Sequence, residues 1–352
     1  MASAPEVAVV VGAYSRDTFV REAVRSVLAQ NVPRSSVEIV VTKNFERPDL
    51  NAELARDGVR VLADPTPRIG TWLLNAIRAT RAPIVTLLDD DDLYAPERLA
   101  RVLEAFRTHP EVGFYRNRVG LVDPAGRPTA PETWPPRAAD PYFDAHGPAL
   151  IAPDAKGELV DLLFRRTRVS FNSSSMAFRR ELLDGRRGEH FAATWLPDSS
   201  LLLNAVASPF GLFLDDRRLT LHRTHPSNVT RTTEWLRWGM ESSWGFAVEA
   251  REFGRPDFAE HYERAALHYD RMLRAGELID RMAAGADRRE VARRAADYAR
   301  FLARHAEERA WNRDVWGVEA YAASYLVSPT FTRRVQRGRP TSGFPTTGLP
   351  AG

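Results

Sequence analysis

Four consecutive aspartates, Asp89 to Asp92, are the residues of this chain with the clearest capacity for chemistry. They follow an apolar run, Ile84–Leu88, which predicts a buried strand. Four carboxylates within one turn repel one another strongly where the dielectric is low. A divalent cation that also carries a phosphorylated substrate would neutralise them. The alternative is an acidic loop before a helix, in which Asp92 only stabilises the helix N-terminus.

Alternating strands and helices must position these acids. Continuous apolar runs predict strands at Val7–Val11, Val37–Val41, Val59–Leu62 and Ile84–Leu88. Apolar residues at helical spacing predict helices over residues 19–28 and 70–80 and from Pro96 onward. This rhythm is typical of a mostly parallel α/β sheet with right-handed crossovers. Ligands of such sheets gather at the carboxyl ends of the strands, where the four acids would lie.

Composition excludes several classes of protein. The chain has 352 residues, 44% of them hydrophobic, so it can form a substantial core. Its net charge of +3 implies no strong attraction to nucleic acid. The absence of cysteine excludes disulfides and thiolate metal sites. We recognise no signal peptide and no apolar run long enough to cross a membrane, and we therefore expect a cytoplasmic protein.

Four segments together are similar to the GT-A-fold glycosyltransferases of family 2, which are mostly inverting, metal-dependent enzymes that use nucleotide sugars. They lie within about residues 7–230 and read VVVGAYSRDTFVREAVRSVLAQ, IGTWLLNAIRATRAPIVTLLDDDDLYAPERL, FNSSSMAFRRELL and LHRTHPSNVT. The resemblance implies a GT-A, Rossmann-like, mostly parallel sheet flanked by helices. Residues 5–122 would bind nucleotide sugar and metal, and residues 123–233 would form the acceptor-binding half of the same domain. We expect a helical C-terminal region at 234–330 and a disordered basic tail at 331–352.

The resemblance also assigns the metal. In the family, an Asp-X-Asp triplet contacts the ribose and holds Mn²⁺ or Mg²⁺ on the diphosphate. It maps to Asp89 and Asp91, with Asp91 as the preferred direct ligand, Asp89 as a second candidate ligand, and Asp90 near the nucleotide sugar. Several relatives complete the metal shell with a late histidine, for which His225 is our first choice and His222 the second.

Contacts to the nucleotide sugar follow from the same resemblance, which places them at Ala13, Tyr14, Arg16, Asn44 and Arg68. Tyr14 would stack on the base, and Asn44 would offer a donor and an acceptor to its edge. The chain departs from the family at three places, the first being Gly12-Ala13, where many relatives have Pro-Thr or a similar pair. Lys43-Asn44 replaces a common acidic pair, which leaves the identity of the base open, and Lys43 could meet a phosphate. Leu74 replaces the usual arginine, so Arg68 or another nearby arginine would supply that phosphate contact.

A base is needed on the face opposite the leaving diphosphate, and in family 2 it is a carboxylate that opens a helix. Asp198, after Pro197, matches that position, although an aspartate there also suits a helix cap. Asp215 and Asp216 are reserve candidates. The polar run Asn172–Ser175 would either line the acceptor pocket or pack as a tight strand.

We therefore expect an enzyme that moves a sugar from a nucleotide-diphosphate sugar to a hydroxyl of a glycan or lipid-linked acceptor. The tryptophans of the C-terminal third could rest on the inner face of the cell membrane, or form the core of a helical subdomain. They are Trp235, Trp238, Trp244, Trp311 and Trp316. Two alternatives stay open: a sugar-phosphate nucleotidyltransferase, which usually begins with a more glycine-rich loop, and a non-catalytic nucleotide-sugar-binding relative.

Overall fold

The computed structural model describes residues 4–130, 147–157, 172–225, 233–285 and 287–305. The chain divides into two compact units. The first comprises Met1–His225 together with Glu249–Phe258, and the second comprises Pro226–Val248 together with Ala259–Gly352. The proposed tail at 331–352 lies outside the described residues.

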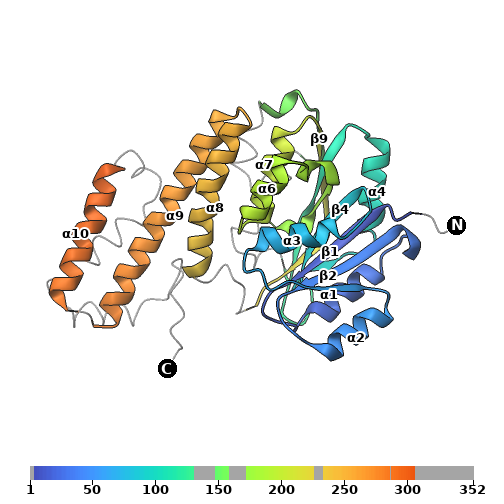
Figure 1. Ribbon diagram of the computed structural model, residues 1–352, viewed down its shortest axis with the longest axis horizontal. Coiled ribbons are helices and arrows are strands. Elements are labelled where there is room, and N and C mark those ends of the chain that lie inside the picture. Colours follow the sequence, from blue (N-terminus) through green and yellow to red (C-terminus); the bar gives the residue numbers. More distant parts are fainter. Residues whose placement is uncertain (1–3, 131–146, 158–171, 226–232, 286, 306–352) are drawn as a thin grey trace. The chain divides into compact units, whose positions relative to one another are not determined.

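The first half of the sheet confirms the strands expected from the sequence. Four parallel strands lie side by side in the order β3-β2-β1-β4 (Figure 1). Their bounds are β1 (Val7–Ala13), β2 (Val37–Lys43), β3 (Arg60–Ala63) and β4 (Ile84–Asp89). Every residue of β1 is buried, as expected of a central strand covered on both faces. Consequently β1, β2 and β4 all end at one edge, where the acids begin.

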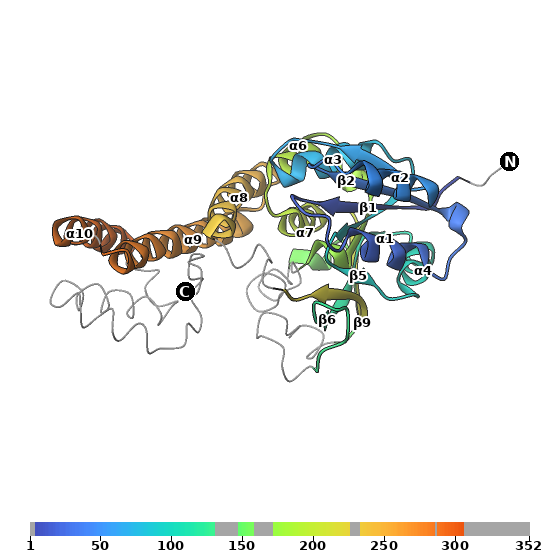
Figure 2. The same cartoon turned by 90° about the horizontal axis from the view of Figure 1, so that it is seen from below.

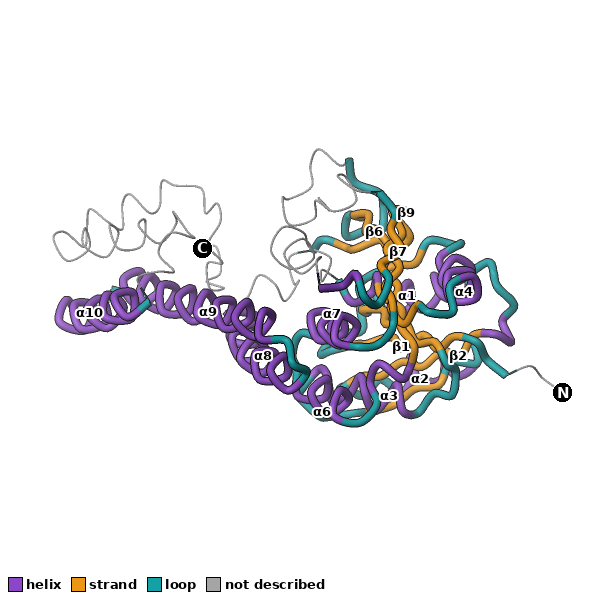
Figure 3. The backbone as a smooth tube through the Cα atoms, turned by 90° about the horizontal axis from the view of Figure 1, so that it is seen from above, coloured by secondary structure: helices purple, strands orange, loops and turns teal. Residues whose placement is uncertain are grey.

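Helices cover both faces of this sheet. Alternate residues of β1, such as Val7 and Val9, pack in one core with helices on the first face: α1 (Val20–Leu28), α2 (Pro48–Arg56) and α4 (Arg98–Thr108). The other face carries α3 (Ile69–Arg78), α6 (Arg186–Ala193) and α7 (Pro197–Ala207). Figure 2 shows α3 and α1 on opposite sides of β1, and Figure 3 shows the same for α7 and α4.

The second half of the sheet is mixed. β8 (Met176–Arg179) pairs antiparallel with β4 and with β6 (Val112–Val122), and β9 (Gly211–Arg223) runs parallel to β6. Two short strands, β5 (Leu93–Tyr94) and β7 (Ala149–Ile151), pair antiparallel with β9. Nine strands thus form one sheet in the described part of the chain. β6 was not predicted, because its buried Arg116 and Asn117 interrupt the apolar pattern.

A fully buried arginine joins the two halves of the sheet beneath the acids. Arg98 of α4 donates to Asn117 Oδ1 (2.9 Å) on β6, Thr220 Oγ1 (3.1 Å) on β9 and Thr86 Oγ1 (2.9 Å) on β4. Its guanidinium also lies 3.9 Å from the centre of the Tyr94 ring. Burial lowers the pKa of Arg98, so polar oxygens and a ring face must replace the water that it has lost.

Both lysines of the chain are buried on backbone carbonyls. Lys156 donates to Ala205 O (3.1 Å) and Phe210 O (2.7 Å) and also to Ser208 O, which satisfies the carbonyls at the C-terminal end of α7. Lys43 donates to Phe45 O and lies 4.9 Å from the centre of the Phe45 ring. Its ammonium group is therefore committed to the turn after β2, where we had considered a phosphate contact.

The C-terminal region is helical where it is described, with α8 (Thr233–Glu252), α9 (Pro256–Ala283) and α10 (Arg288–Arg304). Apolar residues of α9 and α10 form their own core around Met282, Val291 and Leu302. Of the C-terminal tryptophans, Trp238 is buried and Trp235 packs edge-on against Tyr269, whereas Trp311 and Trp316 lie outside the described residues. Within the described residues, no helix combines the length and apolar character needed to cross a bilayer.

Glu249, near the end of α8, makes the stability of the first unit depend on pH. Its side chain is buried beside Asn204, and burial raises its pKa from 4.5 to about 8. The folded protein therefore binds this proton more tightly than the unfolded chain, and stability is lost as pH rises from about 4.5 to about 8.

We expect Glu249→Gln to raise the melting temperature at pH 9 and to change it little at pH 4. Each kcal/mol relieved would add about 2–4 °C in a domain of this size. Thermal unfolding at both pH values measures the effect, and Glu181→Gln, at an exposed position, serves as the matched control. A gain of equal size at the two pH values would contradict the assignment.

Candidate active site

Asp89 is the last residue of β4, and Asp90 to Asp92 form the turn that leads to β5. We call these four residues the acidic turn. The backbone N–H of Asp90 donates to Gly12 O (3.0 Å), and that of Asp92 to Asp89 O (3.1 Å), so the turn is fixed to the end of β1. Carboxylate oxygens of Asp89, Asp91 and Asp92 lie within 4.8 Å of one another. Closely spaced hard oxygen donors are the ligands that Mn²⁺ and Mg²⁺ take, so these residues fit the metal that the sequence suggests.

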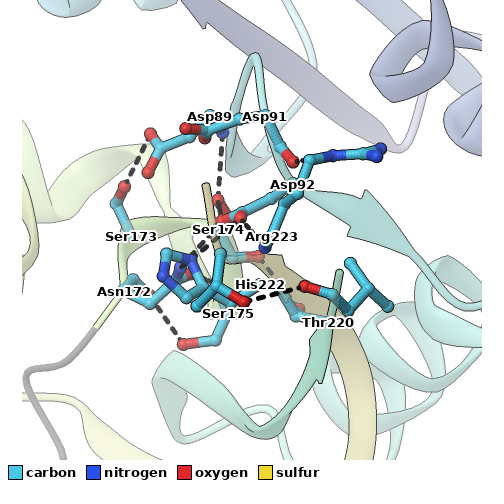
Figure 4. A network of polar contacts seen from close by, with 12 residues as sticks. Asp89, Asp91, Asp92, Asn172, Ser173, Ser174, Ser175, Thr220, His222 and Arg223 are labelled. Carbon is cyan, nitrogen blue, oxygen red and sulfur yellow. Dashed lines mark hydrogen bonds and ion pairs between the residues drawn. The ribbon is translucent and has the colours of Figure 1, made fainter. Parts of the chain in front are cut away.

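Asp92 is an anchor for the turn (Figure 4). Its Oδ2 accepts from Asn172 Nδ2 and Ser174 Oγ, both at 2.7 Å, and its Oδ1 accepts from the His222 ring (3.0 Å) and the Arg223 backbone N–H (3.1 Å). Burial pushes the pKa of Asp92 upward, but His222 and these hydrogen bonds hold it below its usual value. The idea that Asp92 serves a helix N-terminus is wrong, because β5 follows it and α4 begins only at Arg98.

Asp89 has far fewer donors. Ser173 Oγ donates to its carboxylate at 3.2 Å, and Ser174 Oγ accepts from its backbone N–H at 3.0 Å. Burial and repulsion from the other three acids raise the pKa of Asp89 well above its usual value. Added positive charge at this carboxylate would therefore be strongly favoured.

Asp90 and Asp91 are held by Arg16, from the loop after β1. Arg16 makes a bidentate pair with Asp90, through Nε to Oδ2 (2.9 Å) and Nη2 to Oδ1 (3.1 Å), and its Nη2 also donates to Asp91 Oδ2. Burial, opposed by the hydrogen bond from Arg16, raises the pKa of Asp90 to about 7. Arg16 is thus a cation already placed among the acids.

The late histidines both reach the acids, as the sequence suggested. His225 is buried, and its Nε2 lies 2.9 Å from Asp91 Oδ2, while His222 pairs with Asp92. Arg223 is fully buried and bonds to Asp91 O (2.9 Å), Pro124 O (2.8 Å) and Glu22 Oε2 (2.7 Å). These contacts commit the guanidinium of Arg223 to joining β9 with α1 and the acidic turn.

Residues at the ends of β1 and β2 hold each other in place. Ala13 ends β1 and Tyr14 follows it, partly buried. Ser15 has a left-handed backbone (φ 57°), and its N–H donates to Asn44 Oδ1 at 2.6 Å. Asn44 Nδ2 lies 3.3 Å from Ser15 Oγ. Asn44 therefore shapes the loop that carries Tyr14 and Arg16 toward the strand edge.

Asp198 lies in the first turn of α7, the helix that the sequence predicts at this position. Its carboxylate accepts from the backbone N–H of Ser199 (2.8 Å). Burial raises the pKa of Asp198 to about 6, although the backbone N–H groups of Ser199 and Asn172 favour its charged form. Such a carboxylate can be ionised near neutral pH and still accept a proton readily.

Asn172 connects Asp198 to the acidic turn, a role that no local sequence pattern predicted. Its backbone N–H stabilises Asp198, and its side chain donates to Asp92 Oδ2 at 2.7 Å. Its backbone is left-handed (φ 72°), a strained state for a residue other than glycine that often marks a functional site. The serines after it form a short 3-10 turn, η6 (Ser173–Ser175), and bond to the acids rather than extending a strand. The one feature of the sequence that could have indicated these contacts is the run of three consecutive serine hydroxyl groups.

Arg68 fixes the loop that leads to Asp198. It donates to Ala193 O at 2.8 Å, and its guanidinium lies 4.6 Å from the centre of the Trp195 ring. Beside it, the Gly70 N–H donates to Thr194 O (3.0 Å), and a Cβ on Gly70 would lie only 1.8 Å from Phe191 O. The start of α3 therefore packs directly on the end of α6, and only glycine permits that approach.

The reserve base Asp215 lies elsewhere. It is buried near the opposite end of β9, where it accepts from Tyr115 Oη (3.1 Å) and lies 3.6 Å from Arg101. β9 bulges between Asp215 and His222. Their partners on β6, Asn117 and Leu121, are four residues apart, roughly 13 Å along a strand. Asp216 is exposed on the same strand.

Known proteins resemble this chain in sequence and in fold. Among solved structures, S. aureus TarS 1–349 in complex with UDP-GlcNAc has a TM-score of 0.52 at 11% identity, covering 94% of this chain and 91% of that one. The mannosyltransferase PcManGT from Pyrobaculum calidifontis, in complex with GDP-Man and Mn²⁺, has a TM-score of 0.50 at 18% identity, covering 95% and 88%. These likenesses confirm the expected GT-A fold. The family profile described as Glycosyl transferase family 2 matches residues 8–183, half of the chain, and this protein therefore belongs to glycosyl transferase family 2 and is a glycosyltransferase.

Proposed function

We propose that this glycosyltransferase transfers a sugar from a nucleotide-diphosphate sugar to an acceptor hydroxyl with inversion at the anomeric carbon. The observation that carries the proposal is the link through Asn172 between the partly buried Asp198 and the acidic turn. Asp198 can thus receive a proton while the acidic turn binds the metal that neutralises the departing diphosphate. The acceptor would be a hydroxyl of a glycan or of a lipid-linked sugar.

Asp198 is the proposed general base. Its carboxylate would take the proton of the acceptor hydroxyl as that oxygen forms a bond to the anomeric carbon. The bond between this carbon and the donor phosphate oxygen breaks, and the nucleoside diphosphate leaves with the electron pair. Attack from the face opposite the leaving group inverts the configuration.

Asp89 and Asp91 are the proposed ligands of Mn²⁺ or Mg²⁺, with His225 beside Asp91 as a further ligand. When bound, the cation would neutralise charge that develops on the leaving diphosphate. One solved neighbour, PcManGT, is in complex with Mn²⁺, which supports the choice of cation. Ala13, Tyr14, Asn44 and Arg16 stand at the same edge, where we place the nucleotide of the donor.

The acceptor half remains a proposal for residues 123–233, of which 131–146, 158–171 and 226–232 lie outside the described residues. Arg68 remains a proposed phosphate contact, although it would have to leave Ala193 O to serve as one. Contact of the C-terminal helices with a membrane surface is likewise proposed, and exposed Trp244 and Val248 on α8 support it.

A panel of nucleotide sugars tests the function. We expect one donor, with Mn²⁺, to raise the melting temperature and to undergo slow hydrolysis, which stops when the metal is chelated. Formation of a nucleotide sugar from a sugar 1-phosphate and a nucleoside triphosphate would instead identify a nucleotidyltransferase. Tight donor binding with neither hydrolysis nor transfer to any glycan acceptor would favour a non-catalytic binding protein.

We expect the rate of sugar transfer to fall when the pH drops below the pKa of Asp198. The base must be ionised, and its pKa is raised to about 6, so kcat/KM should climb tenfold per pH unit below 6 and level off above it. The measurement uses saturating Mn²⁺, with thermal unfolding followed at each pH to exclude denaturation. A profile that is flat down to pH 4.5 would remove Asp198 from the proton transfer.

A further inference from the structure

Arg16 occupies a position that bears directly on metal binding. Its guanidinium donates two hydrogen bonds to Asp90, at 2.9 and 3.1 Å, and a third to Asp91 Oδ2. Asp91 Oδ2 is also the atom that faces His225 Nε2 at 2.9 Å. One of the two carboxylate oxygens of Asp91 is therefore already covered by positive charge and a ring nitrogen.

The fold directs Arg16 to this place. Ser15 adopts a left-handed backbone that Asn44 holds through its N–H, and this turn aims the following residue at the acids. The side chains of Asp90 and Asp91 are only 5% and 8% exposed, whereas that of Arg16 is 26% exposed. An arginine at the solvent side of buried carboxylates can leave them without crossing the protein interior.

We propose that Arg16 is a built-in counter-cation that competes with the divalent metal for Asp91 and gives up this position when a nucleoside diphosphate arrives. The proposal rests on the proposed function of the acidic turn. Without ligand, Arg16 offsets the repulsion between the acids. A diphosphate offers the guanidinium an equivalent bidentate partner, so its arrival releases Asp91 to the metal. Metal and nucleotide should therefore bind cooperatively, because each removes an obstacle to the other.

Mn²⁺ titration with detection of the unbound ion by electron paramagnetic resonance tests this inference. We expect Arg16→Gln to bind Mn²⁺ alone about tenfold more tightly than the wild type, within the usual range of coupling factors. The gain in Mn²⁺ affinity caused by UDP or GDP should shrink by the same factor. Arg21→Gln is the matched control, because Arg21 pairs with Glu53 (2.7 Å) on the helical face rather than with the acids.

Equal or weaker binding of Mn²⁺ alone by Arg16→Gln would overturn the inference. Should that variant not fold, the wild type carries the test, since a change of partner from carboxylate to diphosphate should shift the NMR resonance of the Arg16 Nε–H when Mg²⁺ and UDP or GDP are added. Arg16→Lys assigns this resonance. An unchanged resonance would also overturn the inference. Different measurements contradict the two proposals. Binding of Mn²⁺ without nucleotide tests the role of Arg16. Failure of the wild type to bind any nucleoside diphosphate in the presence of Mn²⁺ would contradict the proposed function.

Discussion

Replacing Asp198 with asparagine is expected to lower turnover by roughly 10²–10⁴-fold, the range for loss of a general base. Asparagine keeps the size of the side chain and can still accept the N–H of Ser199, so α7 should begin as before. It cannot take a proton at neutral pH. Donor binding should persist, because among the described residues Asp198 is linked to the acidic turn through Asn172.

Asp57→Asn is the control for that measurement. Asp57 is an exposed acid just after α2, and the same change there should leave turnover unaltered. Initial rates of sugar transfer and donor binding by calorimetry separate the two steps. Near-normal turnover of Asp198→Asn would place the base elsewhere, and loss of donor binding would indicate that the substitution disturbed the fold.

Asp91→Asn should weaken the binding of Mn²⁺ in the presence of nucleotide by about a hundredfold or more, since even changes to residues around metal ligands cost 10–100-fold. The amide cannot supply the negative charge of the carboxylate. The remaining acids cannot replace it, because Asp90 stands outside the cluster of carboxylate oxygens that lie within 4.8 Å of one another and Asp92 is filled by four donors. Calorimetric titration of Mn²⁺ with UDP or GDP measures the loss.

Asp92→Asn should behave in the opposite way. Its carboxylate bonds to residues of η6 and β9, so the amide would set an N–H group against donors inside the protein. We expect a lower melting temperature, with Mn²⁺ affinity in the folded fraction closer to that of the wild type. Unchanged Mn²⁺ affinity in Asp91→Asn, or loss of metal without loss of stability in Asp92→Asn, would reverse these roles.

Local patterns in the amino-acid sequence were enough to predict the parallel half of the sheet and the position of the four acids at its edge. Strands such as Val7–Ala13 are continuous apolar runs, and their burial follows directly from composition. The acids had to lie at the carboxyl edge because β4 ends where they begin. Asp198 opens α7 as expected, because Pro197 and Asp198 are local signals for a helix start.

The role of each acid could be assigned only from its surroundings in the folded protein. Asp89 and Asp92 are chemically identical in the sequence, yet burial with few donors raises the pKa of Asp89, while Asn172, Ser174, His222 and Arg223 stabilise the charge of Asp92. These partners lie 80 or more residues away from Asp92 in the sequence, so no local sequence pattern could predict the contacts. The buried Arg98 was hidden for the same reason, since its oxygen partners lie on four separate strands. Local propensity fixes strands and helices, but electrostatic environment is a property of long-range packing.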